Sequence, residues 1–507
     1  MSRKNGGIIG PANTPVGGLI TGLAGGVWRM NDVANFVGNS QWPTGPQSID
    51  NSLRFDDGSS DTLSRSFGTP SSTTTWTISF WVKKCTNGSA LNLCSQGVGT
   101  SNEDRIRFDS SDRLEWTIYK SAVKGKLVTN RLFRDNSAWY NVICRYDSTN
   151  GTAGDRMKIF INGSEETSFS TDTNPDQNET SNFNTSATNY VGSVGSGEFF
   201  DGYMAEVVFT DGQALDQTSF GEFDEDSPTI WKPIDVSGLT FGNNGFYLDF
   251  ENSGSLGADV SGNGNNFTVN NLTSIDQSTD TCTNNFATLN PNQSNNAKDS
   301  VNSLAEGNLR FNDTNNADWR TVIGTLGVNS GKWYWEAEVV GMNGSILVGV
   351  GRQNYLPTTL NKTSSAYPGA DSGDFSASYR ENGIFYTNGS SSSGKSTFTS
   401  AGDTVMVALD MDNGAVYFGV NGTWNDSGDP TSGASKTGAS YTGIQTGEFY
   451  SPSVSGSATN STIDFNFGNP PFTISSGNSD GRGYGNFEYS VPSGYYSLNS
   501  KNLAEFG

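Results

Sequence analysis

The chain has 507 residues and a formal net charge of −22 at pH 7, from 30 Lys and Arg against 52 Asp and Glu. This excess of negative charge argues against nucleic acid as a partner, because phosphate binding needs concentrated Lys and Arg. The sequence contains no histidine, so Ser-His-Asp catalysis, Cys-His catalysis and His-ligated zinc are excluded. The chain can still fill a large core, because it has 30 Phe, 18 Tyr and 11 Trp, and each such ring buries about 150–250 Å².

Residues 1–48 are expected to form an extended docking segment. They are rich in Gly and Pro and contain Trp28, Phe36 and Trp42, which so short a segment cannot bury by itself. We therefore expect these aromatic rings to pack on a partner, with a disordered leader as the alternative. The prolines and glycines interrupt any apolar helix, so neither a signal peptide nor membrane insertion is expected.

From Leu53 onward, short alternating runs separated by Gly, Asn, Asp and Ser predict half-buried strands. The clearest run is 75–84, TWTISFWVKK, in which alternation sends Trp76 toward the core and Trp81 and Lys83 toward solvent. Hairpin turns are expected at 109–112 and at Asn162-Gly163. No stretch of 12 or more residues has a helical apolar period, so the predicted fold class is all-β.

The predicted architecture is two antiparallel β-sandwich (jelly-roll) domains in tandem behind the N-terminal segment. The second block begins near Leu309, and its clearest early strand, within 330–339, places Glu336 and Glu338 on a face that we expect to be exposed to solvent. The expected boundaries are 1–48 for the docking segment, 49–236 for the first sandwich, 237–299 for a strand and an Asn- and Thr-rich connector, 300–475 for the second sandwich, and 476–507 for a C-terminal extension packing on it.

The four cysteines are expected to be free thiols. Cys85, Cys94, Cys144 and Cys282 are widely dispersed in a long chain, and their pairing is not determined by the sequence. The alternative, a metal site of four thiolates, lacks a C-x-x-C pair.

The first block resembles the laminin-G-like and concanavalin A-like jelly-roll family. The matching segments are SLRFDDGSSDTLSRSF (52–67), TWTISFWVKK (75–84), WYNVICRYD (139–147), KIFINGSEE (158–166) and FFDGYMAEVVFTDGQAL (199–215). The resemblance covers about residues 50–225 and implies two antiparallel sheets packed face to face.

The second block is similar to the SPRY domain. The segments SGKWYWEAEV (330–339), GVG (349–351), AGDTVMVALDMDNGAVYFGVNGTW (401–424) and IDFNFGNPPF (463–472) follow that family in order. The residues agree with this resemblance, because the alternating runs on either side of Asp412-Asn413-Gly414 predict a hairpin.

The whole chain also resembles structural proteins of tailed bacteriophages, especially marine phages and cyanophages. This resemblance rests on GGIIGPANTPVGG and VWRMNDV near the N-terminus, and on DVSGNGNNFTVNNL leading to NNFATLNP in the connector. It implies a virion protein made in the infected bacterial cytoplasm, a tail fibre or tail-associated adhesin. Residues 1–48 would attach it to other virion proteins, and its sandwiches would bind a host-surface glycan or protein.

Alternatives within the same resemblance are a capsid-decorating (head-fibre) protein and a polysaccharide depolymerase. A homotrimer is one assembly that it implies, although the sequence has no heptad repeat for a coiled-coil stalk. The acidic pattern of a glucanase, E-x-D-x-x-E, has its nearest candidate in Glu222, Asp224 and Asp226, but Ser227 stands at the final position. We therefore expect no enzymatic activity.

Several residues are candidates for binding. Trp81 and Trp424 are candidate aromatic platforms for a sugar ring, with burial beneath a neighbouring loop as the alternative. The segment from Tyr355 to Tyr379, including Tyr367, is the expected recognition loop of the SPRY-like domain.

No cofactor is expected, with one weak candidate for calcium. Asp259, Asn263 and Asn265 place oxygen ligands at alternating positions of a Gly-containing loop. The alternative is an Asx-type turn that satisfies its own backbone.

Overall fold

The computed structural model describes residues 47–97, 102–195, 197–225, 227–294, 302–313, 319–360, 367–457 and 460–507, and the backbone of strands β1 (Gly7–Ile8) and β2 (Trp28–Arg29). One compact main unit comprises Ile49–Leu215 and Leu239–Gly507, and Asp216–Gly238 separates from it. Phe36, Trp42 and the side chain of Trp28 lie outside the described part of the chain. No helix in that part is long and apolar enough to cross a membrane.

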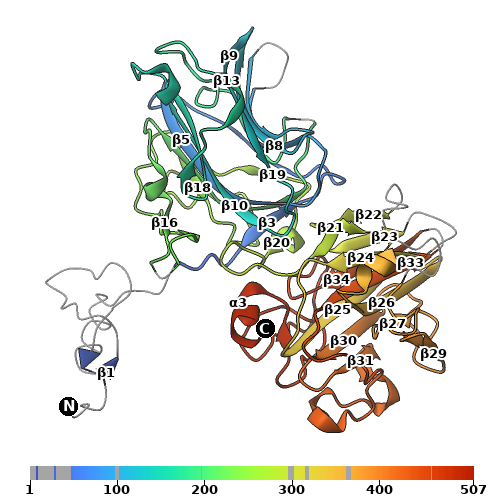
Figure 1. Ribbon diagram of the computed structural model, residues 1–507. Helices are drawn as coiled ribbons and strands as arrows, with labels where there is room; N and C mark the ends of the chain where they lie inside the picture. Colours follow the sequence, from blue (N-terminus) through green and yellow to red (C-terminus); the bar gives the residue numbers. More distant parts are fainter. Residues whose placement is uncertain are drawn as a thin grey trace. The chain divides into compact units, whose positions relative to one another are not determined.

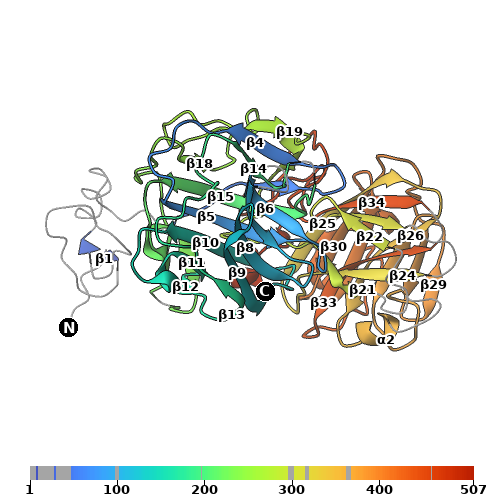
Figure 2. The ribbon, with the colours of Figure 1, turned by 90° about the horizontal axis from the view of Figure 1, so that it is seen from above.

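The first sandwich consists of two sheets (Figures 1 and 2). Sheet I runs in the order β12 (Ser164–Glu165), β11 (Met157–Ile161), β10 (Trp139–Asp147), β5 (Thr75–Lys84), β15 (Gly202–Asp211), β3 (Ser52–Phe55) and β20 (Gln277–Ser278), with β18 (Phe246–Leu248) paired to β15. Sheet II runs in the order β13 (Phe169–Thr173), β9 (Val123–Leu132), β8 (Arg113–Lys120), β7 (Asn102–Phe108), β6 (Leu91–Gln96), β14 (Thr188–Val191), β4 (Thr62–Ser66) and β19 (Thr268–Asn270). The strand pairs of both sheets are antiparallel, as expected for a jelly-roll.

The second sandwich also has two sheets, which form its core between them. Sheet III runs in the order β21 (Leu289–Ser294), β24 (Arg320–Gly324), β33 (Tyr450–Ser457), β26 (Ser345–Arg352), β27 (Ala377–Arg380), β28 (Ile384–Thr387) and β29 (Ser390–Ser392). Sheet IV runs in the order β22 (Asn302–Ala305), β23 (Arg310–Asp313), β34 (Ser461–Asn466), β25 (Lys332–Gly341), β30 (Thr404–Asp410), β31 (Ala415–Val420) and β32 (Thr423–Trp424), with β35 (Tyr496–Ser497) parallel to β25. The predicted all-β class with antiparallel sandwiches is confirmed.

The remaining elements are short. Strands β16 (Gly221–Phe223) and β17 (Trp231–Pro233) form a hairpin in the segment outside the main unit. Among the described residues, the α-helices are α2 (Leu356–Leu360) and α3 (Ser500–Phe506). The 3-10 helices are η1 (Ala153–Asp155), η2 (Gln217–Ser219), η3 (Ser274–Asp276), η4 (Asn425–Ser427) and η5 (Pro430–Ser435).

The turn residues form the hairpins that the sequence predicted. Asn162 and Gly163 both have positive φ, 48° and 74°, and connect β11 to β12. This is the backbone that a two-residue hairpin loop requires, since its twist matches that of the flanking strands. The Asp109 carboxylate closes the β7–β8 turn by accepting hydrogen bonds from the N–H groups of Ser111 and Arg113, at 2.8 and 3.0 Å.

The prediction that one side of β5 faces solvent is wrong. Trp76 lies in the core as expected, but Trp81 is 5% exposed and Lys83 is fully buried. Lys83 donates to Asp280 at 2.8 Å and to Asn285 at 2.8 Å. The connector therefore covers this side of the sheet, and Trp81 offers no ring to a ligand.

The segment 237–299 contributes more strands than the single one expected. Its backbone pairs with strand edges of both sandwiches, since β18, β19 and β20 join sheets I and II while β21 joins sheet III. Few aliphatic side chains are needed for this, because the added strands are held by main-chain hydrogen bonds.

The outer side of β25 is not exposed either. The segment that precedes β35 covers it with Phe487 and Tyr495, which pack on Tyr334. Glu336 is fully buried there and accepts hydrogen bonds from the N–H groups of Glu488 and Tyr489 at 2.9 and 2.8 Å. The expectation that Glu336 faces solvent is therefore wrong, because a distant stretch of chain supplies its partners.

Candidate recognition surfaces

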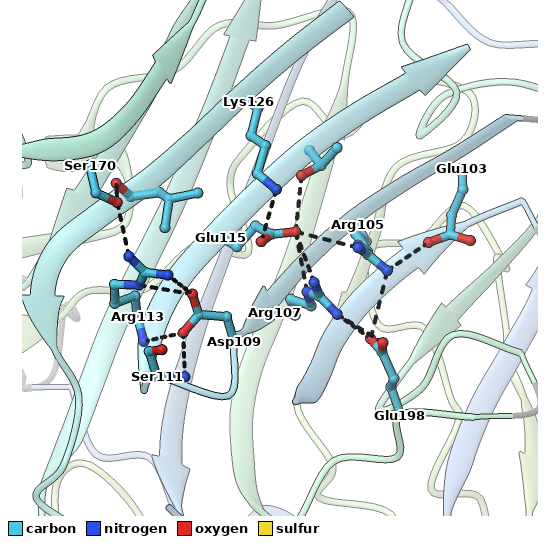
Figure 3. Close-up of polar contacts among 12 residues, drawn as sticks. Glu103, Arg105, Arg107, Asp109, Ser111, Arg113, Glu115, Lys126, Ser170 and Glu198 are labelled. Atoms are coloured by element: carbon cyan, nitrogen blue, oxygen red, sulfur yellow. Dashed lines mark hydrogen bonds and ion pairs between the residues drawn. The ribbon is translucent and has the colours of Figure 1, made fainter. Parts of the chain in front are cut away.

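The outward side of sheet II carries a charged network, which we call the polar face: Glu103, Arg105, Arg107, Glu115, Lys126 and Glu198 (Figure 3). Alternation along β7 produces it, because Asp104, Ile106 and Phe108 point into the sandwich while the residues between them point outward.

The cations of the polar face hold its carboxylates. Arg107 donates to Glu115 at 3.2 Å and to both oxygens of Glu198 at 2.8 and 2.9 Å. Lys126 lies 3.1 Å from the other oxygen of Glu115, and Arg105 bonds Glu103 at 3.2 Å. Burial would raise the pKa of Glu115, but Arg107, Lys126 and Arg105 outweigh it and lower that pKa from its ordinary value. The cations therefore hold Glu115 as an ion-paired carboxylate within the network.

A second surface, the loop cluster, lies on the second sandwich and comprises Asn354, Tyr355, Asp371, Glu448 and Phe449. The Tyr355 hydroxyl donates to the Asp371 carboxylate at 3.0 Å, and Asn354 donates to Glu448. Phe449 is 48% exposed, and its backbone carbonyl accepts from the backbone N–H of Gln353 at 2.8 Å. The structure thus pairs the predicted residue Tyr355 with Asp371, and the residues that precede it, Gln353 and Asn354, bond the segment that contains Glu448 and the exposed Phe449.

Tyr367, also predicted, lies in an aromatic group instead. Its ring meets Trp319 and Tyr386 edge-on, at centroid distances of 5.1 and 5.2 Å, and the Arg380 guanidinium lies 5.4 Å from the Trp319 centroid. All four side chains are half-buried. The group therefore packs the recognition loop against sheet III and does not leave a fully exposed ring for a ligand.

Trp424 is half-buried rather than a free platform. It follows a turn in which Asn421 and Gly422 have positive φ, and its ring meets Tyr334 at a centroid distance of 6.4 Å. It packs on the cluster that contains Phe487. This agrees with the alternative that a neighbouring segment covers it.

The candidate calcium loop satisfies its own backbone. The Asp259 carboxylate accepts from the N–H groups of Tyr247, Ser261 and Asn265 at 2.7–2.9 Å. Asn263 and Asn265 donate their amides to backbone carbonyls. This is the Asx-type arrangement. Among the described residues, no group of three or more His, Cys, Asp or Glu side chains is placed to hold a metal ion.

The remaining chemical candidates are paired or unreactive. Lys232 lies 3.3 Å from Glu222 and 3.6 Å from Asp224, while Asp226 lies outside the described residues. All four cysteines are free thiols, and burial raises the pKa of each.

Sequence reasoning missed Phe449, Trp319 and the polar face. The signal for the polar face was present in the charged alternate positions of 103–107. The sequence contains no such signal for Phe449, because an aromatic residue directly before a buried strand is predicted to belong to that strand.

Comparison with known proteins agrees with these two folds. Residues 56–218 match the Laminin_G_3 family, described as the concanavalin A-like lectin/glucanases superfamily, and residues 332–470 match the SPRY domain. No curated protein matches the chain. The chain therefore contains a concanavalin A-like domain followed by a SPRY domain.

Three solved structures illustrate the likeness. The SPRY domain of human HERC1 is 20% identical over 35% of this chain and 96% of that one, with a TM-score of 0.26. A putative carbohydrate binding protein from Bacteroides ovatus is 16% identical over 44% of this chain and 59% of its own length, with a TM-score of 0.30. A heptameric SAP-like pentraxin from Limulus polyphemus is 16% identical over 33% and 78%, with a TM-score of 0.25.

Proposed function

We propose that this chain is a non-enzymatic recognition protein of a tailed bacteriophage particle, a tail fibre or tail-associated adhesin that binds a host-surface glycan through its loop cluster. The observation that carries the proposal is the exposed residue Phe449, whose backbone bonds Gln353, in the same pair of chain segments as the polar residues Asn354, Tyr355 and Glu448. An aromatic face takes the apolar side of a sugar ring, and amide and carboxylate groups take its hydroxyls. Loops on a rigid sandwich are a common place for such a site.

Two features support binding without hydrolysis. Glycoside cleavage uses one protonated carboxylic acid and one ionised carboxylate on either side of the bond. On the polar face, Glu103, Glu115 and Glu198 are each bonded to an arginine, and the sequence has no histidine to act instead.

The virion location rests on the resemblance of the leader and connector to phage structural proteins. A chain lacking residues 2–48 should therefore fold but fail to join phage particles. Particles carrying the full chain would be labelled with an antibody and viewed by electron microscopy. Label on the tail is expected; label on the capsid would favour the head-fibre alternative, and normal incorporation of the truncated chain would contradict the docking role.

Binding is tested with polysaccharide extracted from the host envelope. Phe449→Ala should weaken binding by the purified chain about thirtyfold or more, since hot-spot aromatic side chains contribute at least about 2 kcal/mol. Phe223→Ala is the matched control, because Phe223 is 41% exposed but lies in another part of the chain. Equal binding by both variants would contradict the site, and release of sugar from the polysaccharide would favour the depolymerase alternative.

A further inference from the structure

Three side chains that can react with one another meet on the covered side of β5, beneath the connector. The Lys83 ammonium donates to the side-chain oxygen of Asn285 and to the Asp280 carboxylate, at 2.8 Å each, and to the Phe286 carbonyl at 3.3 Å. Lys83 and Asp280 are both fully buried. An amine, an amide and a carboxylate are therefore held together away from bulk water.

The Asn285 amide turns its carbonyl toward the lysine. Its nitrogen Nδ2 donates to the Ser137 carbonyl at 2.7 Å, and its oxygen Oδ1 accepts from Lys83. The opposite orientation would set the amide N–H groups against the ammonium, which has no acceptor. Asn285 is half-buried, so a small product released from this amide is close to solvent.

The Asp280 carboxylate is placed to move protons between the other two groups. Its Oδ2 accepts from Lys83, while its Oδ1 accepts from the Trp139 indole N–H at 3.1 Å and from the Phe286 N–H at 3.3 Å. The ring centroid of the fully buried Tyr203 lies 5.6 Å from the Lys83 ammonium. Aromatic side chains thus line a site in which the orientation of the carboxylate is fixed.

We propose that Lys83 and Asn285 join in an intramolecular isopeptide bond, with Asp280 as the catalytic acid and base. The structure describes the three groups before the reaction, as an ion pair beside an amide. The reaction occurs once in each chain and turns over no substrate. It does not depend on the proposed recognition function.

The reaction begins when Asp280 takes one proton from Lys83, which leaves a neutral amine and a carboxylic acid. The amine nitrogen Nζ uses its electron pair to bond Cγ of Asn285, and the π electrons move to Oδ1, which receives the Asp280 proton. Asp280 next carries one proton from Nζ to Nδ2. The bond between Cγ and Nδ2 then breaks, its electron pair leaves with ammonia, and the Oδ1 proton returns to Asp280 as the carbonyl re-forms.

The overall change balances without an oxidant or another reactant. Ammonia takes up the proton left on Asp280, so one ammonium group and one primary amide give one secondary amide and one ammonium ion. The new bond joins positions 202 apart in the chain. Residues 84–284 are then excluded from the path of any force that pulls on the two ends of the chain.

Mass spectrometry of the intact full chain, freshly folded and after prolonged incubation, tests the bond. The mass should fall by that of one ammonia. Asn-Gly pairs such as Asn162-Gly163 can lose ammonia by forming a succinimide, so the position of the change must also be found. Cleavage before aspartate should give one branched peptide that contains 61–103 and 280–298.

Three variants should lack both the ammonia loss and the branched peptide. Asn285→Leu removes the electrophile, Asp280→Asn removes the acid and base, and Lys83→Arg supplies a cation that cannot be deprotonated to a nucleophile. Lys84→Arg is the matched control, because Lys84 is also buried and lies 2.6 Å from a carboxylate, that of Asp112. The control should keep the branched peptide.

Stretching of single molecules by their ends gives a second measurement. The linked chain should extend about 700 Å less than Asn285→Leu, since each residue spans at most about 3.3–3.6 Å. Equal extension would overturn the proposal, as would an unchanged wild-type mass with separate 61–103 and 280–298 peptides. A branched peptide that persists in Asn285→Leu would overturn it too. The wild-type mass needs no variant, so this result stands even where a variant fails to fold.

Discussion

The ion pair between Lys83 and Asp280 is expected to be a main attachment of the connector to the first sandwich. Both side chains are fully buried, and the Lys83 ammonium lies 2.8 Å from the Asp280 carboxylate. The ammonium also donates to the Asn285 side chain and to the Phe286 carbonyl, at 2.8 and 3.3 Å. The second carboxylate oxygen accepts from the Trp139 indole N–H at 3.1 Å.

Lys83→Met should therefore destabilise the chain strongly. Methionine fills much of the space of the lysine stem, but it leaves the fully buried Asp280 carboxylate without its cation partner. Removing one partner of a buried ion pair costs about 3–5 kcal/mol. In a domain of 150–250 residues each kcal/mol lowers the melting temperature by about 2–4 °C, so a fall of roughly 6–20 °C is expected.

Scanning calorimetry measures this fall, and a double-mutant cycle identifies its cause. Lys83→Met combined with Asp280→Asn leaves no buried charge, so the double variant should be more stable than the two single changes predict when added, by about 1–3 kcal/mol. Lys158→Met is the control: its partners Asp155 and Glu165 are both 40% exposed, and exposed pairs contribute about 0–1 kcal/mol. Equal effects of Lys83→Met and Lys158→Met, or purely additive effects in the cycle, would refute the reasoning.

Three further predictions concern buried groups. Burial raises the pKa of Asp201 from 3.8 to about 8. Its contribution to the free energy of unfolding is therefore present at low pH and is lost as the pH rises through 8, at about 1.4 kcal/mol per pH unit. Asp201→Asn should flatten this fall when urea unfolding is measured between pH 5 and 8. Glu336→Leu should cost about 2–4 kcal/mol in the same assay, because two backbone N–H groups lose their acceptor, while a cost no larger than that of Glu336→Gln would contradict this. Gly468→Ala should lower stability by about 1–3 kcal/mol, because φ is +122° and a Cβ would come within 2.5 Å of the Phe286 ring; an unchanged melting temperature would show that the loop relaxes.

The strands and their turns could be predicted from local sequence. Alternation over 75–84 determines β5, and Asn162-Gly163 adopts the positive φ values that its hairpin needs. These features depend on neighbours one or two positions away, so short-range chemistry suffices. The segments that resemble the concanavalin A-like and SPRY families predicted both sandwiches, and the matches over 56–218 and 332–470 confirm them.

The second face of each sheet could not be predicted in this way. Lys83 and Glu336 look like solvent-facing residues, because a charged side chain at an alternate position has the same pattern whether water or a distant partner satisfies it. Asp280 lies 197 positions from Lys83, and the N–H groups of Glu488 and Tyr489 lie more than 150 positions from Glu336.

The residues of the candidate site were also only partly predictable from the sequence. Tyr355 was predicted because a long polar loop between strands suggests recognition, whereas Phe449 joins it only through the pairing of β26 with β33. The contact between the two sandwiches likewise needs distant stretches to meet, since Arg54 donates to the carbonyls of both Ile275 and Pro470. Local sequence determined which residues could form strands and turns in this protein. Which polar side chains are buried and which groups pair with them was decided by tertiary structure, because only folding brings together groups so distant along the chain.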